Sequence, residues 1–216
     1  MASVAITAAV PDPSLLAEGN PAYAGGMSDR LEDSALMLRY RDGDAAAFET
    51  LYRRHNAPLY RYLVRLCLNR DTAEDLFQEA WAKIIRSRGN YRASAKFSTY
   101  LFHVAHNCFV DHVRRNRRYA TSADTAPEPV AEPGDEPEQQ TEKLLARIRL
   151  HSALEALPDE QRDAFLLYEE GSLTIDEIAR VTGVNRETAK SRLRYAVDKL
   201  KVSMAAPRSP RERRTE

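Results

Sequence analysis

Apolar residues recur along this chain at intervals of three and four, rather than alternating with polar residues. This spacing places apolar side chains on one face of an α-helix, whereas a half-buried strand requires a period of two. The 216 residues include only 8 glycines. The pattern predicts an all-α fold.

The helical pattern is interrupted in three places, which divides the chain into five segments. Residues 1–28 mix prolines and glycines without periodicity and predict a disordered N-terminal arm. Residues 29–119 and 143–201 predict two small helical domains. Between them, residues 120–142 hold four prolines, seven acids and no aromatic residue, which predicts a flexible acidic linker. Residues 202–216 predict a disordered Pro/Arg tail.

Caps and breaks predict the helix limits in the first domain. Asp44 is placed to cap one helix, which Pro58 must kink or restart. The run Asp71-Thr72-Ala73-Glu74 has a capping residue followed three positions later by glutamate, and predicts the start of another helix. That helix reaches about residue 87, and a last helix follows at about 98–118.

The second domain contains the pattern of a helix-turn-helix at about residues 174–199. Thr174-Ile175-Asp176-Glu177 is a capping box, Gly183 suits a turn with positive φ, and Asn185 can cap the next helix. The following helix has one apolar and one basic face, as a duplex-DNA reader requires. The alternative is an amphipathic helix pair with a solvated basic face. The candidate DNA contacts are Arg186, Thr188, Lys190, Ser191, Arg192 and Arg194.

Charge supports this interpretation because it is segregated, although the net charge is zero. Residues 86–118 contain eight Lys or Arg against one acid, and residues 180–201 contain seven against two. Residues 120–142 contain seven acids and no base. Because a field acts over about one Debye length, two basic patches can bind phosphates in a neutral protein.

The helix at about 98–118 interleaves aromatic residues with cations, a combination that suits unpaired bases. Asn107 can hydrogen-bond a base edge. Tyr100 and His103 are placed either for such a surface or for the core. Phe102, Phe109 and Val113 share one face and are expected in the core.

Other chemistry is not indicated by the residues. His103, His106, Cys108 and His112 suggest a metal hydrolase, but no fourth ligand cluster accompanies them, so we expect no metal and no cofactor. The sequence has no P-loop, GxSxG, HExxH or dinucleotide motif, which argues against an enzyme. Cys67 and Cys108 lie in apolar helical patterns and predict buried free thiols.

The chain has no apolar run of about 20 residues and no basic N-terminal signal region. We therefore expect a cytoplasmic protein without membrane insertion.

Residues 71–81 (DTAEDLFQEAW) and 97–107 (FSTYLFHVAHN), followed by Asp111 and Arg114-Arg115, are similar to region 2 of the extracytoplasmic-function (ECF) sigma factors. The pairs Leu157-Pro158, Gln161-Arg162 and Ile178-Ala179 and the run Lys190-Ser191-Arg192-Leu193 are similar to region 4. The resemblance covers about residues 31–118 and 143–201.

The resemblance implies three interfaces. Asp75, Leu76, Gln78, Glu79 and Trp81 would dock on the β′ clamp helices of core RNA polymerase. The melted −10 strand would be held by Arg92, Lys96, Tyr100, His103, Asn107, Arg114 and Arg115. The helix at 186–199 would read the −35 duplex.

The resemblance also implies contact with the β flap of polymerase and control by an anti-sigma factor. Tyr100-Leu101 replaces the family's usual Trp-Leu, and Asn185 to Lys190 departs from its usual Pro-x-Gly-Thr-Val-Lys run, so the promoter sequence stays open. A DNA-binding regulator that never meets polymerase is the rival hypothesis, since it needs only the helix-turn-helix. The acidic linker is hypothesised to mimic nucleic acid in the polymerase channels.

Overall fold

The computed structural model describes residues 32–119 and 148–205, and all regular elements in these two ranges are helices. The all-α fold class is confirmed. The predicted arm at 1–28, the predicted linker at 120–142 and residues 206–216 of the predicted tail lie outside the described residues.

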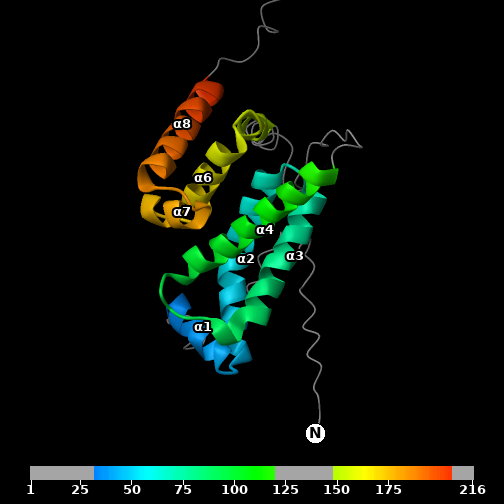
Figure 1. Cartoon of the computed structure of the whole chain (residues 1–216), viewed down its shortest axis with the longest axis vertical. Helices are drawn as coiled ribbons and strands as arrows, with labels where there is room; N and C mark the ends of the chain where they lie inside the picture. Colours follow the sequence, from blue (N-terminus) through cyan, green and yellow to red (C-terminus); the bar gives the residue numbers. More distant parts are fainter. Residues whose placement is uncertain (1–31, 120–147, 206–216) are drawn as a thin grey trace, which may run out of the picture.

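The helices form an N-terminal group and a C-terminal group (Figure 1). In the first group, α2 packs against α1 and α3, and α3 packs against α4. In the second, α6 and α7 both pack against α8. The elements are α1 (Asp33–Arg41), α2 (Ala45–Cys67), α3 (Arg70–Ser87), a 3-10 turn (Arg88–Asn90), α4 (Phe97–Tyr119), a helical stretch at 148–155, α6 (Asp159–Glu169), α7 (Ile175–Thr182) and α8 (Arg186–Ala205).

Local capping explains where the helices of the first group begin. Asp44 caps α2, as predicted, because its carboxylate accepts hydrogen bonds from the backbone N–H groups of Ala46 and Ala47. The predicted start of α3 at Asp71 is wrong. The N-cap is Asn69, whose side-chain oxygen accepts from the Thr72 N–H at 2.8 Å.

Pro58 does not restart a helix, since α2 runs through it without interruption from Ala45 to Cys67. A proline removes one backbone donor from a helix and disfavours the preceding turn. Tertiary packing offsets that cost here, because Leu51, Leu59 and Leu63 on either side of it are fully buried.

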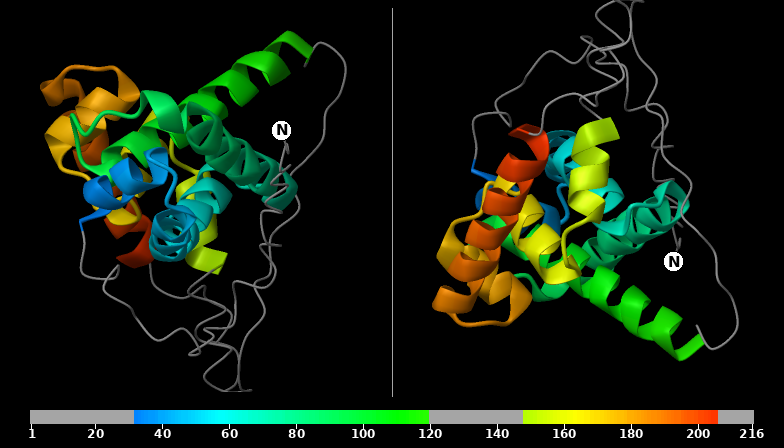
Figure 2. Two further views of the ribbon diagram at one scale, coloured as in Figure 1. Left: turned by 90° about the horizontal axis from the view of Figure 1, so that it is seen from below. Right: turned by 90° about the horizontal axis from the view of Figure 1, so that it is seen from above.

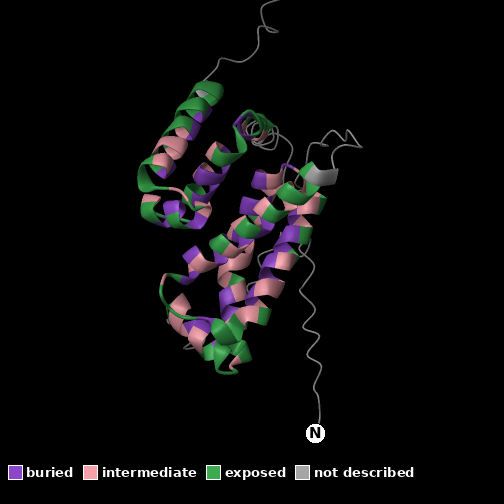
Figure 3. Cartoon of the chain, viewed as in Figure 1, coloured by how far each residue is buried: buried purple, intermediate pink, exposed green. Residues whose placement is uncertain are grey.

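The core of the first group is rich in aromatic side chains. Trp81, Tyr62, Phe77, Phe97 and Phe102 are all at most 1 % exposed. Figure 3 shows buried positions running along the facing sides of α2, α3 and α4. Each fully buried apolar side chain of this size contributes roughly 1.5–3 kcal/mol, which holds the three long helices in a fixed arrangement.

The C-terminal group has the predicted helix-turn-helix geometry. The capping box of Thr174 and Glu177 opens α7, and Gly183 ends it with a φ of 68°, in the left-handed region that favours glycine. The last helix, α8, extends to Ala205, beyond the predicted end. On its inner face Ala189, Ala196 and Leu200 are buried.

The two groups are packed against each other in this structure. Helix α6 packs against α2, and helix α7 packs against α4. The views from below and above show that the C-terminal end of α4 projects beyond both groups (Figure 2). None of the helices in the described ranges has the length and apolarity needed to cross a membrane.

Candidate nucleic-acid interface

A side-chain cap fixes the start of helix α8. The side-chain oxygen of Asn185 accepts a hydrogen bond from the Thr188 N–H at 2.8 Å. Glu187 lies in the first turn, where a negative charge complements the helix dipole. The start of α8 is therefore rigidly placed and exposed, as a base-reading segment requires.

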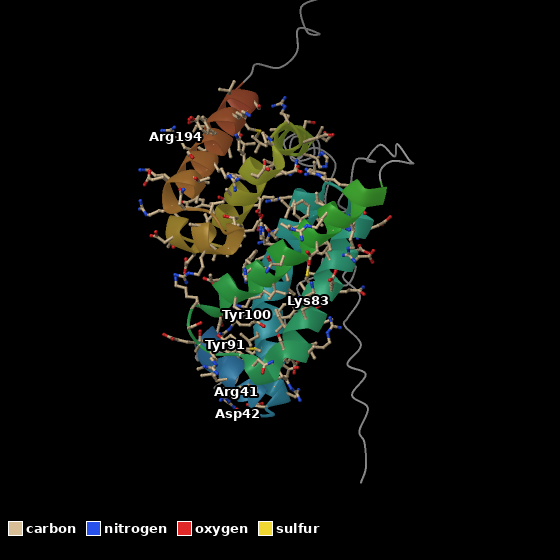
Figure 4. All side chains as sticks on the ribbon, in the orientation of Figure 1. Arg41, Asp42, Lys83, Tyr91, Tyr100 and Arg194 are labelled. Carbon is tan, nitrogen blue, oxygen red and sulfur yellow. The ribbon has the colours of Figure 1, made fainter. Side chains whose placement is uncertain are left out.

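The predicted contact residues of α8 fall into two classes. Arg186, Lys190 and Arg194 are exposed, and Figure 4 shows Arg194 on the side of α8 away from the other helices. Thr188, Ser191 and Arg192 are half-buried. The Ser191 hydroxyl also donates to the Thr188 carbonyl oxygen at 3.0 Å, so this hydroxyl is already engaged within the helix.

Arg186 has two acidic neighbours. Its guanidinium lies 3.0 Å from the carboxylate of Asp176 in α7 and 3.5 Å from that of Glu187. All three side chains are more than half exposed. Exposed ion pairs of this kind are weak, so DNA phosphate can displace them.

Tyr100 lies at the junction of α3 and α4. Its hydroxyl is 2.8 Å from the Ser87 Oγ, and its ring packs edge-on against Tyr91 with centroids 5.3 Å apart (Figure 4). The ring is half-buried. One part of the Tyr100 side chain therefore packs within the fold, and another part remains accessible to solvent.

Asn107 and His103 form an exposed polar pair one helical turn apart. The Asn107 Nδ2 lies 3.3 Å from the His103 Nε2. Burial, together with the neighbouring His106, lowers the pKa of His103 below its ordinary value. The imidazole is thus neutral near pH 7, and it suits hydrogen bonding or stacking better than phosphate neutralisation.

The other predicted cations of this surface are spread along α4 and the loop before it. Arg92, Arg114 and Arg115 are exposed. Arg115 also lies 3.7 Å from Glu79 of α3. Lys96 instead points to the C-terminal group, where its Nζ is 3.3 Å from a carboxylate oxygen of Glu177.

The predicted polymerase-docking surface on α3 is only partly available. Asp75 and Gln78 are exposed, and Glu79 is half-buried beside Lys83, 2.9 Å away. Leu76 and Trp81 are 2 % and 0 % exposed, so in this structure their side chains lie in the core and not on the surface of α3. Both belong to the core because they continue the apolar face of α3.

The histidines and cysteines of α4 do not form a metal site. No three His, Cys, Asp or Glu side chains in residues 32–119 and 148–205 are grouped so that they could hold a metal ion.

Cys67 and Cys108 are free thiols. Burial raises the pKa of Cys67 to about 12, which leaves its thiol unreactive near pH 7.

A set of polar residues between the two groups was missed by the sequence patterns. It consists of Arg61, Tyr62, Arg65, Thr99 and His106 in the first group and Asp163, Glu170 and Glu177 in the second. The paired residues lie between 57 positions apart in the sequence, for His106 and Asp163, and 109 positions apart, for Arg61 and Glu170. Local periodicity carries no information on such pairs.

Comparison with known families matches both helical groups. Residues 51–119 match the family model described as sigma-70 region 2, and residues 147–200 match the model described as sigma-70, region 4. The two matches follow the chain in the same order as the two groups of helices.

Curated relatives match along most of the chain. RNA polymerase sigma factor CarQ of Myxococcus xanthus is 33 % identical over 168 residues, covering 76 % of this chain and 93 % of CarQ. The ECF RNA polymerase sigma factor SigM of Mycobacterium tuberculosis is 30 % identical over 172 residues, covering 80 % of this chain and 84 % of SigM.

A solved structure shares the fold. The sigma factor RpoE of Bartonella quintana, in complex with the anti-sigma factor NepR, aligns with a TM-score of 0.63 at 21 % identity. The alignment covers 74 % of this chain and 98 % of RpoE.

Proposed function

The chain belongs to the ECF sigma factors, the non-catalytic subunits that direct RNA polymerase to promoters, and on this premise we propose how its residues divide that task. The acidic side of α3 docks on the β′ clamp helices of core polymerase. The exposed side of α4 holds the −10 strand, and α8 reads the −35 duplex.

This division rests on one observation: two cationic helices, α4 and α8, occur in a single chain with the acidic residues of α3. Only a protein that meets both polymerase and promoter DNA needs all three surfaces. A regulator that binds only duplex DNA does not need the α3 residues Asp75, Gln78 and Glu79, and it does not need an exposed Asn107 on α4.

The chemistry of each surface fits its proposed target. Duplex DNA is read in the major groove by a helix such as α8. The −10 bases must first leave the stack, which costs a few kcal/mol. Stacking on an aromatic ring contributes about 1–3 kcal/mol per base, so Tyr100 with His103 and Asn107 can offset that cost.

Two partners follow from the same premise. The C-terminal group would contact the β flap of polymerase, and an anti-sigma factor would cover the polymerase-binding surfaces. RpoE of Bartonella quintana was solved in complex with the anti-sigma factor NepR, and CnrH, a second protein of this fold, was solved in complex with the cytosolic domain of CnrY. The site of action would be the cytoplasm, where core polymerase is found.

In vitro transcription tests the proposal. Core polymerase, the purified protein and genomic DNA should give discrete start sites that share sequences near −35 and −10. Core polymerase alone should give none of these starts. If the protein binds DNA fragments but neither binds core polymerase nor produces starts, the regulator hypothesis is correct instead.

A further inference from the structure

The half-buried side chain of Tyr100 is contacted at its hydroxyl and at its ring by residues of one short segment. Ser87, the last residue of α3, meets the hydroxyl, and Tyr91, which follows the 3-10 turn, packs against the ring. We propose that Ser87 is a positioning residue for promoter opening, because its hydrogen bond to Tyr100 orients the ring for an unpaired base of the −10 strand. This inference rests on the proposed function of Tyr100.

The direction of the hydrogen bond follows from the other partners of Ser87. Its Oγ lies 2.7 Å from the Lys83 carbonyl oxygen and 3.4 Å from that of Ile84, and a carbonyl oxygen can only accept. A serine hydroxyl has one hydrogen to donate, so this hydrogen is directed at the α3 backbone. The Tyr100 hydroxyl, 2.8 Å from the same Oγ, is therefore the donor to Ser87.

The two hydrogen bonds form a directed chain from the Tyr100 ring to the backbone of α3. Tyr100 donates to Ser87, and Ser87 donates to the Lys83 carbonyl oxygen one helical turn earlier. Successive hydrogen bonds polarise and strengthen one another. Without the Ser87 hydroxyl, the Tyr100 hydroxyl loses this acceptor, and only the ring contacts restrain the side chain.

Two buried aromatic residues cover part of the Tyr100 ring. Tyr91 packs at 61° with the ring centroids 5.3 Å apart, and Phe97 lies 6.3 Å away at 54°. Tyr91 and Phe97 are only 5 % and 1 % exposed, so neither can move aside easily. The accessible part of the Tyr100 ring is the part that these two rings leave uncovered.

The segment that supplies Ser87 and Tyr91 is anchored on both sides of the 3-10 turn. The Tyr91 N–H donates to the Arg88 carbonyl oxygen at 3.1 Å, which closes the turn. The Arg88 guanidinium lies 5.2 Å from the centroid of the Tyr40 ring in α1. Residues 87–91 therefore provide a fixed support for Tyr100 before any DNA is bound.

A ring that is already oriented captures a base at lower cost. Stacking on a freely rotating side chain also requires that the side chain lose its rotamer freedom. The hydrogen bond to Ser87 removes much of that loss in advance. An immobilised side chain of this kind changes an association constant by about fivefold, which is the size of effect expected from Ser87.

The first experiment measures capture of unpaired bases by holoenzyme made from the full chain and core polymerase. The probe is a fluorescent single-stranded DNA with the −10 sequence of a promoter mapped with this protein. Ser87→Ala should weaken binding of the probe by about fivefold. Ser87→Thr keeps a hydroxyl at the same position and should bind as the unsubstituted protein does. Equal binding by Ser87→Ala and the unsubstituted protein would overturn the proposal.

A second probe distinguishes base capture from contact with the DNA backbone. It has the same length and phosphates, but the nucleotides of its −10 element lack bases. Ser87→Ala and the unsubstituted protein should bind this probe equally, because no base is present to stack on Tyr100. A loss of about fivefold on this probe as well would contradict a role through the ring.

A double-mutant cycle tests whether Ser87 acts through Tyr100. Tyr100→Phe keeps the ring and removes the hydroxyl, so it should weaken binding of the intact probe as much as Ser87→Ala does. The double variant should lose no more than either single variant, because both remove the same hydrogen bond. Losses that multiply would show that Ser87 acts independently of Tyr100 and would overturn the proposal.

Further measurements separate positioning from a general loss of structure. All variants should keep the affinity of the unsubstituted protein for core polymerase and its helix content by circular dichroism. If Ser87→Ala fails to fold, Tyr100→Phe removes the same hydrogen bond from the opposite partner and gives the same test.

Tyr100→Ala distinguishes failure of this inference from failure of the proposed function. If Tyr100→Ala binds the intact probe as tightly as the unsubstituted protein, Tyr100 has no role at −10, and the inference fails together with that assignment. If Tyr100→Ala loses binding while Ser87→Ala and Tyr100→Phe retain it, the proposed function stands and only the role of Ser87 is refuted.

Discussion

At the scale of single residues, the exposed cations of α8 differ in their surroundings. Arg186 is paired with Asp176 and Glu187, whereas the Arg194 guanidinium lies 5.0 Å from the centroid of the Tyr195 ring. Lys190 lies on the same exposed face. Cations beyond the first turn of a recognition helix more often contact phosphate than bases.

We therefore predict that Lys190→Ala and Arg194→Ala each weaken binding to the −35 duplex. As phosphate contacts, each should also lower the slope of log K against log salt by about one. Fluorescence anisotropy at several KCl concentrations measures this slope. A slope that stays unchanged while preference for the −35 sequence is lost would identify a base contact instead.

Asn107 is predicted to act in strand opening and not in polymerase binding. Asn107→Ala should leave the affinity for core polymerase unchanged and reduce permanganate reactivity of unpaired thymines near −10. The matched control is Asn116→Ala. Asn116 pairs with His112, and Asn107 pairs with His103 in the same way on the same helix, α4. Normal opening with Asn107→Ala would remove Asn107 from the −10 surface.

At the scale of elements, helix starts depend on side chains that the sequence leaves ambiguous. Asn69 and Asp71 are both acceptable caps by residue type, and the structure selects Asn69. Asp71 then lies in the first turn of α3, where its charge interacts with the helix dipole.

The assignment of Asn69 as the N-cap predicts that Asn69→Ala and Asp71→Ala lower the free energy of unfolding by different amounts. Asn69→Ala should lower the free energy of unfolding by about 1 kcal/mol, the usual loss of an N-cap. Asp71→Ala should cost less, about 0.3–1 kcal/mol for an exposed charge near a helix start. Urea unfolding followed by circular dichroism compares them. A larger loss at Asp71 would restore the sequence-based start of the helix.

Glu177 makes the start of α7 sensitive to acid. Burial raises the pKa of this carboxyl, but hydrogen bonds from Thr174 and Lys96 outweigh that effect and lower its pKa below the ordinary 4.5. A depressed carboxyl pKa stabilises the fold above the unfolded value, and the contribution is lost as pH falls through the folded value.

The melting temperature should therefore fall as the pH is lowered from about 4.5. In Glu177→Gln, which has no carboxyl to titrate, the decrease over the same range should be smaller. Thermal unfolding between pH 7 and pH 3 gives both profiles. Parallel profiles would show that Glu177 does not carry this dependence.

At the scale of the whole molecule, the surfaces proposed for polymerase docking and for promoter binding are separate. Glu79→Lys reverses the charge in the centre of the acidic side of α3 and should abolish co-purification with core polymerase. Binding of the full chain to −35 duplex through α8 should persist. Glu49→Lys, the same change at an exposed position of α2, is the control and should retain polymerase. Equal polymerase binding by both variants would refute the docking assignment.

The sequence by itself determined the fold class, the helix-turn-helix and the charge distribution. Each depends on neighbouring residues: the helical period, the capping box of Thr174 and Glu177, and glycine at the positive-φ turn. Such signals span one or two helical turns, so they are readable in a single sequence.

Only the tertiary structure decided which side chains are buried in the core and which polar residues pair with each other over long distances in the sequence. Leu76 and Trp81 are buried because neighbouring helices cover them, although polar residues flank them on α3. Asp163 meets Tyr62 across 101 positions, and Glu170 meets Arg61 across 109. Long-range pairs depend on how whole helices pack, and no local pattern records that packing. These contacts follow from the packing of α6 on α2 and of α7 on α4.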